Sequence, residues 1–253
     1  MKKTDSVIPH IEVKSLLEVV EEEKIPRRLD YIYDQAPTHD CGTCAECCFA
    51  CAQIYPIEFL NILSYLITLP ELTQARLARK VIEYEMLHLT TLEYTCPWLE
   101  NNACIIAPRK PLVCRYFGLY PEAEYSEMLT KSREENEKLA MGYAKYHRIL
   151  LPEDVMTYDV EQCQVNEAAK GELKVATAQE RQRLHQQIYS LSEQTMPDAW
   201  LSADLQRFSF QYALFYFSED EMEEARLDII KEFQASGSST TLDNLIAKHG
   251  FCF

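Results

Sequence analysis

The sequence contains little glycine and little proline for its length. Only 6 of its 253 residues are glycine and 11 are proline. This argues against collagen-like or low-complexity character, and against a large sheet with many tight turns. With so few glycines, and with no G-x-G-x-x-G or Walker pattern, we do not expect a nucleotide site of the Rossmann or P-loop kind.

Basic side chains and long apolar runs are also scarce. The 25 basic side chains face 40 acidic ones, a formal net charge of −15, which disfavours binding to nucleic acid and to anionic membranes. No stretch reaches the ~18 apolar residues of a membrane span, because Asn61, Ser64 and Thr68 interrupt the best candidate, residues 59–69. No secretory signal follows the charged start, so the sequence predicts a cytoplasmic protein without a membrane span.

Cysteine, by contrast, is abundant. A reducing compartment disfavours structural disulfides, so the 10 cysteines are best explained by metal binding. The strongest signal is Cys41-Gly-Thr-Cys44-Ala-Glu-Cys47-Cys48, in which two-residue gaps let one loop wrap an ion or a cluster. Thiolates are soft ligands that favour zinc, copper(I) or iron–sulfur clusters.

A second group of cysteines follows at wider spacing. Between Cys96 and Cys104, Asn101-Asn102 favours a turn that brings both sulfurs to one side. The complete set of predicted metal ligands is Cys41, Cys44, Cys47, Cys48, Cys96, Cys104, Cys114 and Cys163. These eight thiols suit two four-thiolate centres, or one centre with spare thiols. Cys51 and Cys252 are interpreted as cysteines outside the centre, although Cys51 is near enough to Cys48 to replace a neighbour.

These residues resemble a known family. The order Cys-x2-Cys-x2-Cys-Cys, then Cys96-Pro-Trp-Leu, Cys104 and Arg109-x-Pro111-Leu-Val-Cys114-Arg115, is similar to the YkgJ-type cysteine-cluster family. The resemblance covers about residues 41–120 and implies a domain that chelates zinc or iron, in a family named for iron–sulfur oxidoreductases. A related signature occurs in flagellin lysine methylases, which this chain resembles less. Residues 121–253 match no family in this way.

Two arginines and several aromatics flank the cysteines. Arg109 and Arg115 are predicted to lie behind the thiolates, where a guanidinium offsets negative charge and donates hydrogen bonds to sulfur. An arginine in solvent or paired with an acid is the alternative for Arg109. Trp98, Tyr116 and Phe117 are predicted to shield the centre from water, or to belong to the ordinary core.

We expect a mainly α protein in which an irregular cysteine-rich metal-binding core packs against helices. The chain divides into a polar lead-in (1–40), a cysteine-cluster domain (41–165) and a helical region (166–253). Helices are predicted over about 11–23, from Pro56, over about 70–88, over about 121–147, within 167–191, over 221–233 and over 241–248. The aromatic segment 208–217 alternates like a strand, and we interpret it as buried core, with a cofactor pocket or partner surface as the alternative.

Three functions agree with this pattern. The first is a redox or electron-transfer protein, or a component of a redox enzyme, with an iron–sulfur cluster of the 4Fe–4S type and a protein redox partner. The second is a structural zinc protein whose helical tail is an interaction module. The third is an iron-dependent enzyme that modifies a peptide or protein. Iron is favoured over zinc because the adjacent side chains of Cys47 and Cys48 diverge, and because the second cysteine group is not a compact C-x2-C pair.

Overall fold

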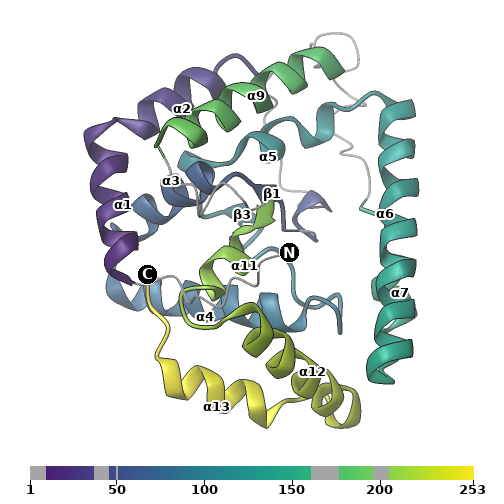
Figure 1. Ribbon diagram of the computed structural model, residues 1–253. Helices are drawn as coiled ribbons and strands as arrows, with labels where there is room; N and C mark the ends of the chain where they lie inside the picture. The colour runs from purple at the N-terminus through teal and green to yellow at the C-terminus, as the bar shows by residue number, and fades with distance from the viewer. Residues whose placement is uncertain (1–9, 37–45, 50, 161–176, 196–204) are drawn as a thin grey trace.

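The computed structural model describes residues 10–36, 46–49, 51–160, 177–195 and 205–253 (Figure 1). The predicted ligands Cys41, Cys44 and Cys163 lie outside these residues. The elements in chain order are α1 (His10–Glu22), α2 (Ile25–Tyr33), the 3-10 helix η1 (Glu46–Phe49), β1 (Gln53–Ile54), α3 (Pro56–Leu66), α4 (Glu71–Leu87), β2 (Leu99–Glu100), β3 (Ala103–Cys104), the 3-10 helix η2 (Ala107–Arg109), α5 (Leu112–Tyr116), the 3-10 helix η3 (Phe117–Leu119), α6 (Glu122–Gly142), the π-helix η4 (Tyr143–His147), α7 (Glu153–Met156), α9 (Ala178–Thr195), β4 (Gln206–Arg207), α11 (Phe208–Ala213), α12 (Glu219–Ser236) and α13 (Thr240–His249).

Helices dominate this arrangement, as predicted. In the described residues the strands form two short antiparallel pairs, β1 with β4 and β2 with β3. Local signals begin several of the helices: Pro56 is the first residue of α3. At α12, the Ser218 hydroxyl accepts from the Glu221 amide and the Glu221 carboxylate accepts from the Ser218 amide, which is the predicted capping box.

Residues 1–40 are more than a polar lead-in. The helix predicted over about 11–23 is α1, but α2 was not predicted. Ile25 and Leu29 of α2 are completely buried, and α2 packs against α3 and α9, its neighbour in Figure 1. In α2 the apolar side chains recur every four residues between charged ones. This spacing is typical of a helix with one buried face and could have predicted α2.

One large hydrophobic core joins the three regions of the sequence. It includes Val13 from the first region, Leu60 and Leu112 from the second, and Leu184 and Ile229 from the third. Burial of these side chains removes apolar surface from water and is the main stabilising contribution to the fold. The cysteine-bearing segments are therefore held by the same core as both ends of the described chain.

The aromatic segment 208–217 belongs to this core. Its first residues form helix α11, which lies against α4 at the centre of Figure 1, so its alternating pattern does not mark a strand. Phe208 and Tyr212 are 1% exposed, which confirms the prediction of buried aromatics. Just before α11, Arg207 of β4 pairs with Gln53 of β1, and this pairing brings the segment beside the residues that follow Cys51.

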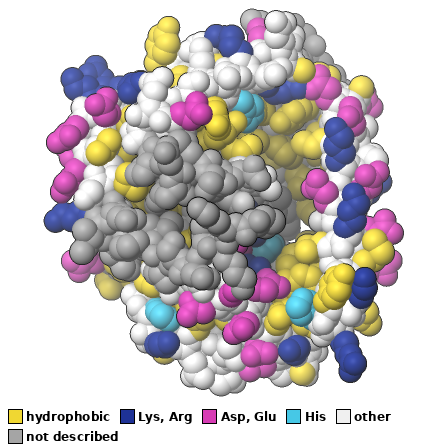
Figure 2. All heavy atoms as spheres, viewed as in Figure 1, with side chains coloured by type: hydrophobic (Ala, Val, Ile, Leu, Met, Phe, Trp, Pro, Cys, Tyr) yellow, Lys and Arg dark blue, Asp and Glu magenta, His cyan; other side chains and the backbone are white. Residues whose placement is uncertain are grey.

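α6 and α7 form a column at the right of Figure 1. Tyr125 is the buried side chain of α6, and acidic and basic side chains are interspersed along this edge of the molecule in Figure 2. The lower end of the column is attached by a smaller apolar cluster that includes Tyr143, Ile149 and Ile230 of α12. Across the described part of the chain, no helix is both long and apolar enough to cross a bilayer.

Candidate metal centre

Cysteine side chains from distant parts of the sequence line one small cavity of about 60 Å³. The cysteines that line it are Cys47, Cys48, Cys51, Cys96, Cys104 and Cys114. Drug-sized ligands occupy pockets of roughly 300–1,000 Å³, so this cavity suits an ion-sized group. All the predicted ligands within the described residues lie here, together with one cysteine that was not predicted.

Main-chain hydrogen bonds hold the first two cysteine segments together. The Cys96 amide donates to the Cys48 carbonyl over 2.6 Å, and the Cys96 carbonyl accepts from the Leu99 amide over 2.9 Å. The backbone N–H and C=O groups of Cys96 are thus both hydrogen-bonded, whatever its side chain binds. The segments before α3 and after α4 meet at this point.

A tight turn then returns the chain to the cavity. Leu99 of β2 pairs with Cys104 of β3, and Asn101 and Asn102 between them have φ angles of 51° and 59°. Two-residue hairpin turns need positive φ at both central positions, which asparagine tolerates better than most residues. The turn predicted between Cys96 and Cys104 is confirmed, and it does place both cysteines on one cavity.

Cys114 is positioned through a buried carboxylate. It lies on the short helix α5, which begins at Leu112. The Leu112 amide donates to Glu58 Oε1 over 2.8 Å, and the Tyr33 hydroxyl donates to the same oxygen over 2.9 Å. Glu58 is 2% exposed, and burial raises the pKa of its carboxyl group although these donors lower it. Glu58 therefore ties α2, α3 and the cysteine-bearing helix together.

Cys51 is the residue that the sequence interpretation left outside the centre. It is buried, lines the cavity with the predicted ligands, and its amide donates to the Tyr84 hydroxyl over 2.9 Å. The Cys51 side chain lies close to the Cys96 thiol and raises its pKa. The signal was available in the sequence, because Cys48-x2-Cys51 continues the two-residue gaps of the cluster.

The cavity favours protonated thiols when no cation is bound. The hydrogen bond to Cys51 and burial raise the pKa of Cys96 well above its ordinary value. Burial and the neighbouring sulfur of Cys96 do the same to the pKa of Cys114. The thiolate is the form that binds metals, so a bound cation must displace these protons, and metal affinity must rise with pH.

Positive side chains close to the sulfurs oppose these pKa shifts. Lys110 lines the cavity and lowers the pKa of Cys114, while Lys80 lowers that of Cys96. Arg207 is close enough to Cys51 for the two charges to interact. These three cations are placed to offset thiolate charge, which is the role that the sequence predicts for two arginines.

The two predicted arginines make other contacts. An Arg115 nitrogen, Nε, donates to the Lys110 carbonyl over 2.7 Å, and its guanidinium lies 4.2 Å above the Tyr33 ring. Arg109 Nη1 is 3.7 Å from Asp30 Oδ2, and its buried Nε has no partner among the described residues. Neither arginine is among the residues that line the cavity. Arg115 supports the loop that carries Lys110, and Arg109 adopts the acid-paired alternative.

Arg207 is held by a buried ionic network next to the cavity. Glu85, which is fully buried, accepts from Arg207 Nη2 over 3.0 Å, from Arg226 Nη2 over 2.7 Å and from the Ser209 hydroxyl over 2.7 Å. Burial alone would raise the pKa of Glu85, but the positive charges around it, led by Arg207, lower it to about 2. The network joins α4, β4, α11 and α12 and fixes the cation beside Cys51.

Apolar side chains form the remaining walls of the cavity. Trp98 packs edge-on against Phe208, with ring centroids 4.8 Å apart, and both rings line the cavity. The predicted shielding role of Trp98 is thus supported by its position. Tyr116 instead contacts the side chain of His185 through its hydroxyl, and Phe117 packs edge-on against Tyr120 and Tyr125.

The described residues of the cavity do not form a complete metal-coordination site. Within the residues that the structure describes, no three His, Cys, Asp or Glu side chains are gathered closely enough to hold a metal ion. The donor set nevertheless fits zinc or iron, since soft sulfur ligands meet in an apolar cavity with balancing cations. A multi-iron cluster is larger than a single ion, so it requires the cysteine-bearing segments to separate. Such rearrangement is expected where metal binding is coupled to folding.

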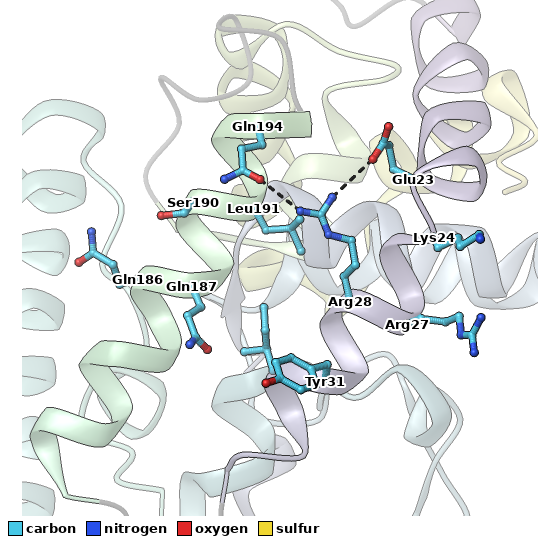
Figure 3. A pocket seen from close by; sticks show the side chains of 11 residues that line it. Glu23, Lys24, Arg27, Arg28, Tyr31, Gln186, Gln187, Ser190, Leu191 and Gln194 are labelled. Atoms are coloured by element: carbon cyan, nitrogen blue, oxygen red, sulfur yellow. Dashed lines mark hydrogen bonds and ion pairs between the residues drawn. The ribbon is translucent and has the colours of Figure 1, made fainter.

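A larger and more open cavity of about 680 Å³ lies between α2 and α9 (Figure 3). Arg28 reaches across it, with Nη2 donating to Gln194 Oε1 over 3.2 Å and Nη1 lying 3.6 Å from Glu23 Oε2. Its described lining consists of charged, carboxamide, hydroxyl and apolar side chains without a cysteine. This cavity is therefore distinct in chemistry from the cysteine cavity.

Comparisons of this chain with models of protein families, with curated proteins and with solved structures found no match. The resemblance to the YkgJ-type family thus depends on the cysteine and arginine–proline patterns alone.

Proposed function

We propose that this protein is an iron–sulfur or iron-binding redox protein whose centre is built on the cysteine cavity. The supporting observation is that every predicted ligand within the described residues lines this one cavity: Cys47, Cys48, Cys96, Cys104 and Cys114. Unrelated buried cysteines would have no reason to come together from such distant positions. The ligand set is completed in this proposal by Cys41, Cys44 and Cys163, and the protein acts in the cytoplasm.

The thiol groups would bind the metal and the surrounding residues would tune it. When bound, an iron–sulfur centre exchanges single electrons at a potential set by its charge, hydrogen bonds and exposure to water. Lys110, Lys80 and Arg207 would offset thiolate charge, while Trp98 and Phe208 would limit access of water. Since the sequence has no nucleotide motif, electrons would come from a protein partner.

The test begins with anaerobic purification and measurement of iron, zinc and acid-labile sulfide per chain, together with a visible spectrum. The proposal expects iron and sulfide in similar amounts, or iron bound by thiolates without sulfide. In the variant Cys114→Ser the iron content should fall at least severalfold. Cys252→Ser is the matched control, because Cys252 is exposed and lies outside the cavity lining.

Two results would contradict the proposal. Iron that stays unchanged in both Cys114→Ser and Cys96→Ser would mean that the cavity does not bind it. One or two zinc ions in a colourless protein would favour the structural zinc protein, with the helical tail as its interaction module. Turnover of a peptide by the iron-loaded protein would favour the third function, the iron-dependent enzyme.

A further inference from the structure

Cys51 and Cys96 line the same cavity of about 60 Å³, and main-chain hydrogen bonds hold each of them there. The Cys51 amide is anchored to the Tyr84 hydroxyl, and the Cys96 amide is anchored to the Cys48 carbonyl. Between these anchors the Cys51 side chain lies close enough to the Cys96 thiol to raise its pKa. A disulfide requires two cysteines whose β-carbons approach closely, and two thiols that line one cavity of about 60 Å³ from fixed backbones are placed to meet this condition.

We propose that Cys96 has two alternative partners, the metal centre and Cys51, and that it forms a disulfide with Cys51 when the metal is absent and peroxide is present. Hydrogen peroxide is the oxidant: the two S–H bonds and the O–O bond break, one S–S bond forms, and two water molecules are released. The two thiols lose two electrons and two protons. Only the competition with metal depends on the proposed function; the disulfide itself does not.

The two states exclude each other because both use the same sulfur atom. A metal-bound thiolate of Cys96 is not available to Cys51, and a Cys51–Cys96 disulfide removes one ligand from the centre. Oxidation would therefore block reloading of the empty site, and a thiol reductant would restore it.

The experiment uses the full chain, stripped of metal by a chelator under reducing conditions and then freed of reductant without oxygen. One equivalent of hydrogen peroxide is added, remaining thiols are alkylated, and cross-linked peptides are identified by mass spectrometry after digestion. Thiols are also counted before and after treatment. Cys51→Ser is the test variant, and Cys252→Ser is the control because its thiol is outside the cavity lining.

We expect wild type and Cys252→Ser to lose two thiols per chain and to yield the Cys51–Cys96 cross-link. Cys51→Ser should yield no such cross-link, and after peroxide it should recover a larger share of its own untreated metal content than the wild type does. A cross-link between other cavity cysteines in place of this one would overturn the proposal, and so would an equal loss of reloading in Cys51→Ser and the wild type. If Cys51→Ser does not fold, the cross-link in the wild type still decides the result.

Discussion

The main-chain amide of Cys96 donates a hydrogen bond to the carbonyl oxygen of Cys48 over 2.6 Å, although α3 and α4 separate the two cysteines in the chain. This main-chain bond holds two predicted metal ligands side by side. Their backbones therefore keep this position whatever their sulfur atoms bind.

The turn between Cys96 and Cys104 depends on two residues in the left-handed region of φ. Asn101→Val should destabilise the protein by about 1 kcal/mol, because a β-branched residue tolerates positive φ angles poorly. Asn101 is exposed, so the substitution changes side-chain packing little. Metal retention should fall with it, because the turn positions Cys104. Urea unfolding and metal content are the measurements. Asn101→Gly is the control, and equal losses in both variants would contradict the role of φ.

Glu58 supports the start of the helix that carries Cys114. In Glu58→Gln, the amide group cannot accept from all the donors that now reach the carboxylate, which include Leu112 N–H and Tyr33 O–H. We expect a loss of about 1–3 kcal/mol in the free energy of unfolding, with weaker metal retention.

The control for this substitution is Tyr33→Phe, which removes one donor and leaves the Leu112 bond in place. It should cost about 1 kcal/mol and leave the metal content unchanged. If Tyr33→Phe lost as much metal as Glu58→Gln, the effect would not come from the start of α5.

Glu85 balances two arginine side chains in the protein interior. Glu85→Gln leaves the charges of Arg207 and Arg226 without their buried carboxylate, and breaking such a pair costs about 3–5 kcal/mol. Glu83→Gln is the matched control on the same helix: it breaks the Arg79–Glu83 pair, in which Arg79 is largely exposed, and should cost no more than about 0.5 kcal/mol. Chemical denaturation of both variants decides between these expectations.

His88 makes the protein sensitive to mild acid. Burial and the charge of Arg207 lower the pKa of His88 from 6.5 to about 4, although Glu85 opposes this. The unfolded chain therefore binds the extra proton first, so stability is full above about pH 6.5 and falls as the pH drops towards 4. His88 Nδ1 donates to the carbonyls of Tyr84 and Glu85, and an amide can replace that donor.

The unfolding free energy of His88→Gln should thus depend less on pH than that of the wild type between pH 6.5 and 4. Glu85 contributes its own acid sensitivity at lower pH: with a pKa of about 2, its stabilisation is full above about pH 4.5 and is lost as the pH approaches 2. Equal pH slopes for wild type and His88→Gln would count against the neutral state of His88 in the folded protein.

Local signals predicted most of the helices. Apolar spacing, Pro56 and the Ser218–Glu221 capping box act within a few residues, and the structure agrees with them. α2 was missed because its charged residues suggested a solvated lead-in, whereas Ile25 and Leu29 are buried by packing against α3 and α9. That packing depends on segments distant in the chain.

The sequence by itself predicted a cluster of soft thiols, because thiols at two-residue gaps have few other uses, and it predicted the turn between Cys96 and Cys104 that the structure shows. The gap Cys48-x2-Cys51 agrees with a place for Cys51 in the cluster, but the tertiary structure decided that Cys51 lies on the same cavity. It also decided that Lys110 and Arg207 lie near the sulfurs while Arg115 contacts Tyr33. The physical reason is that spacing specifies ligands within one loop, whereas a cation and a thiol from separate segments meet only where the core brings β1 beside β4.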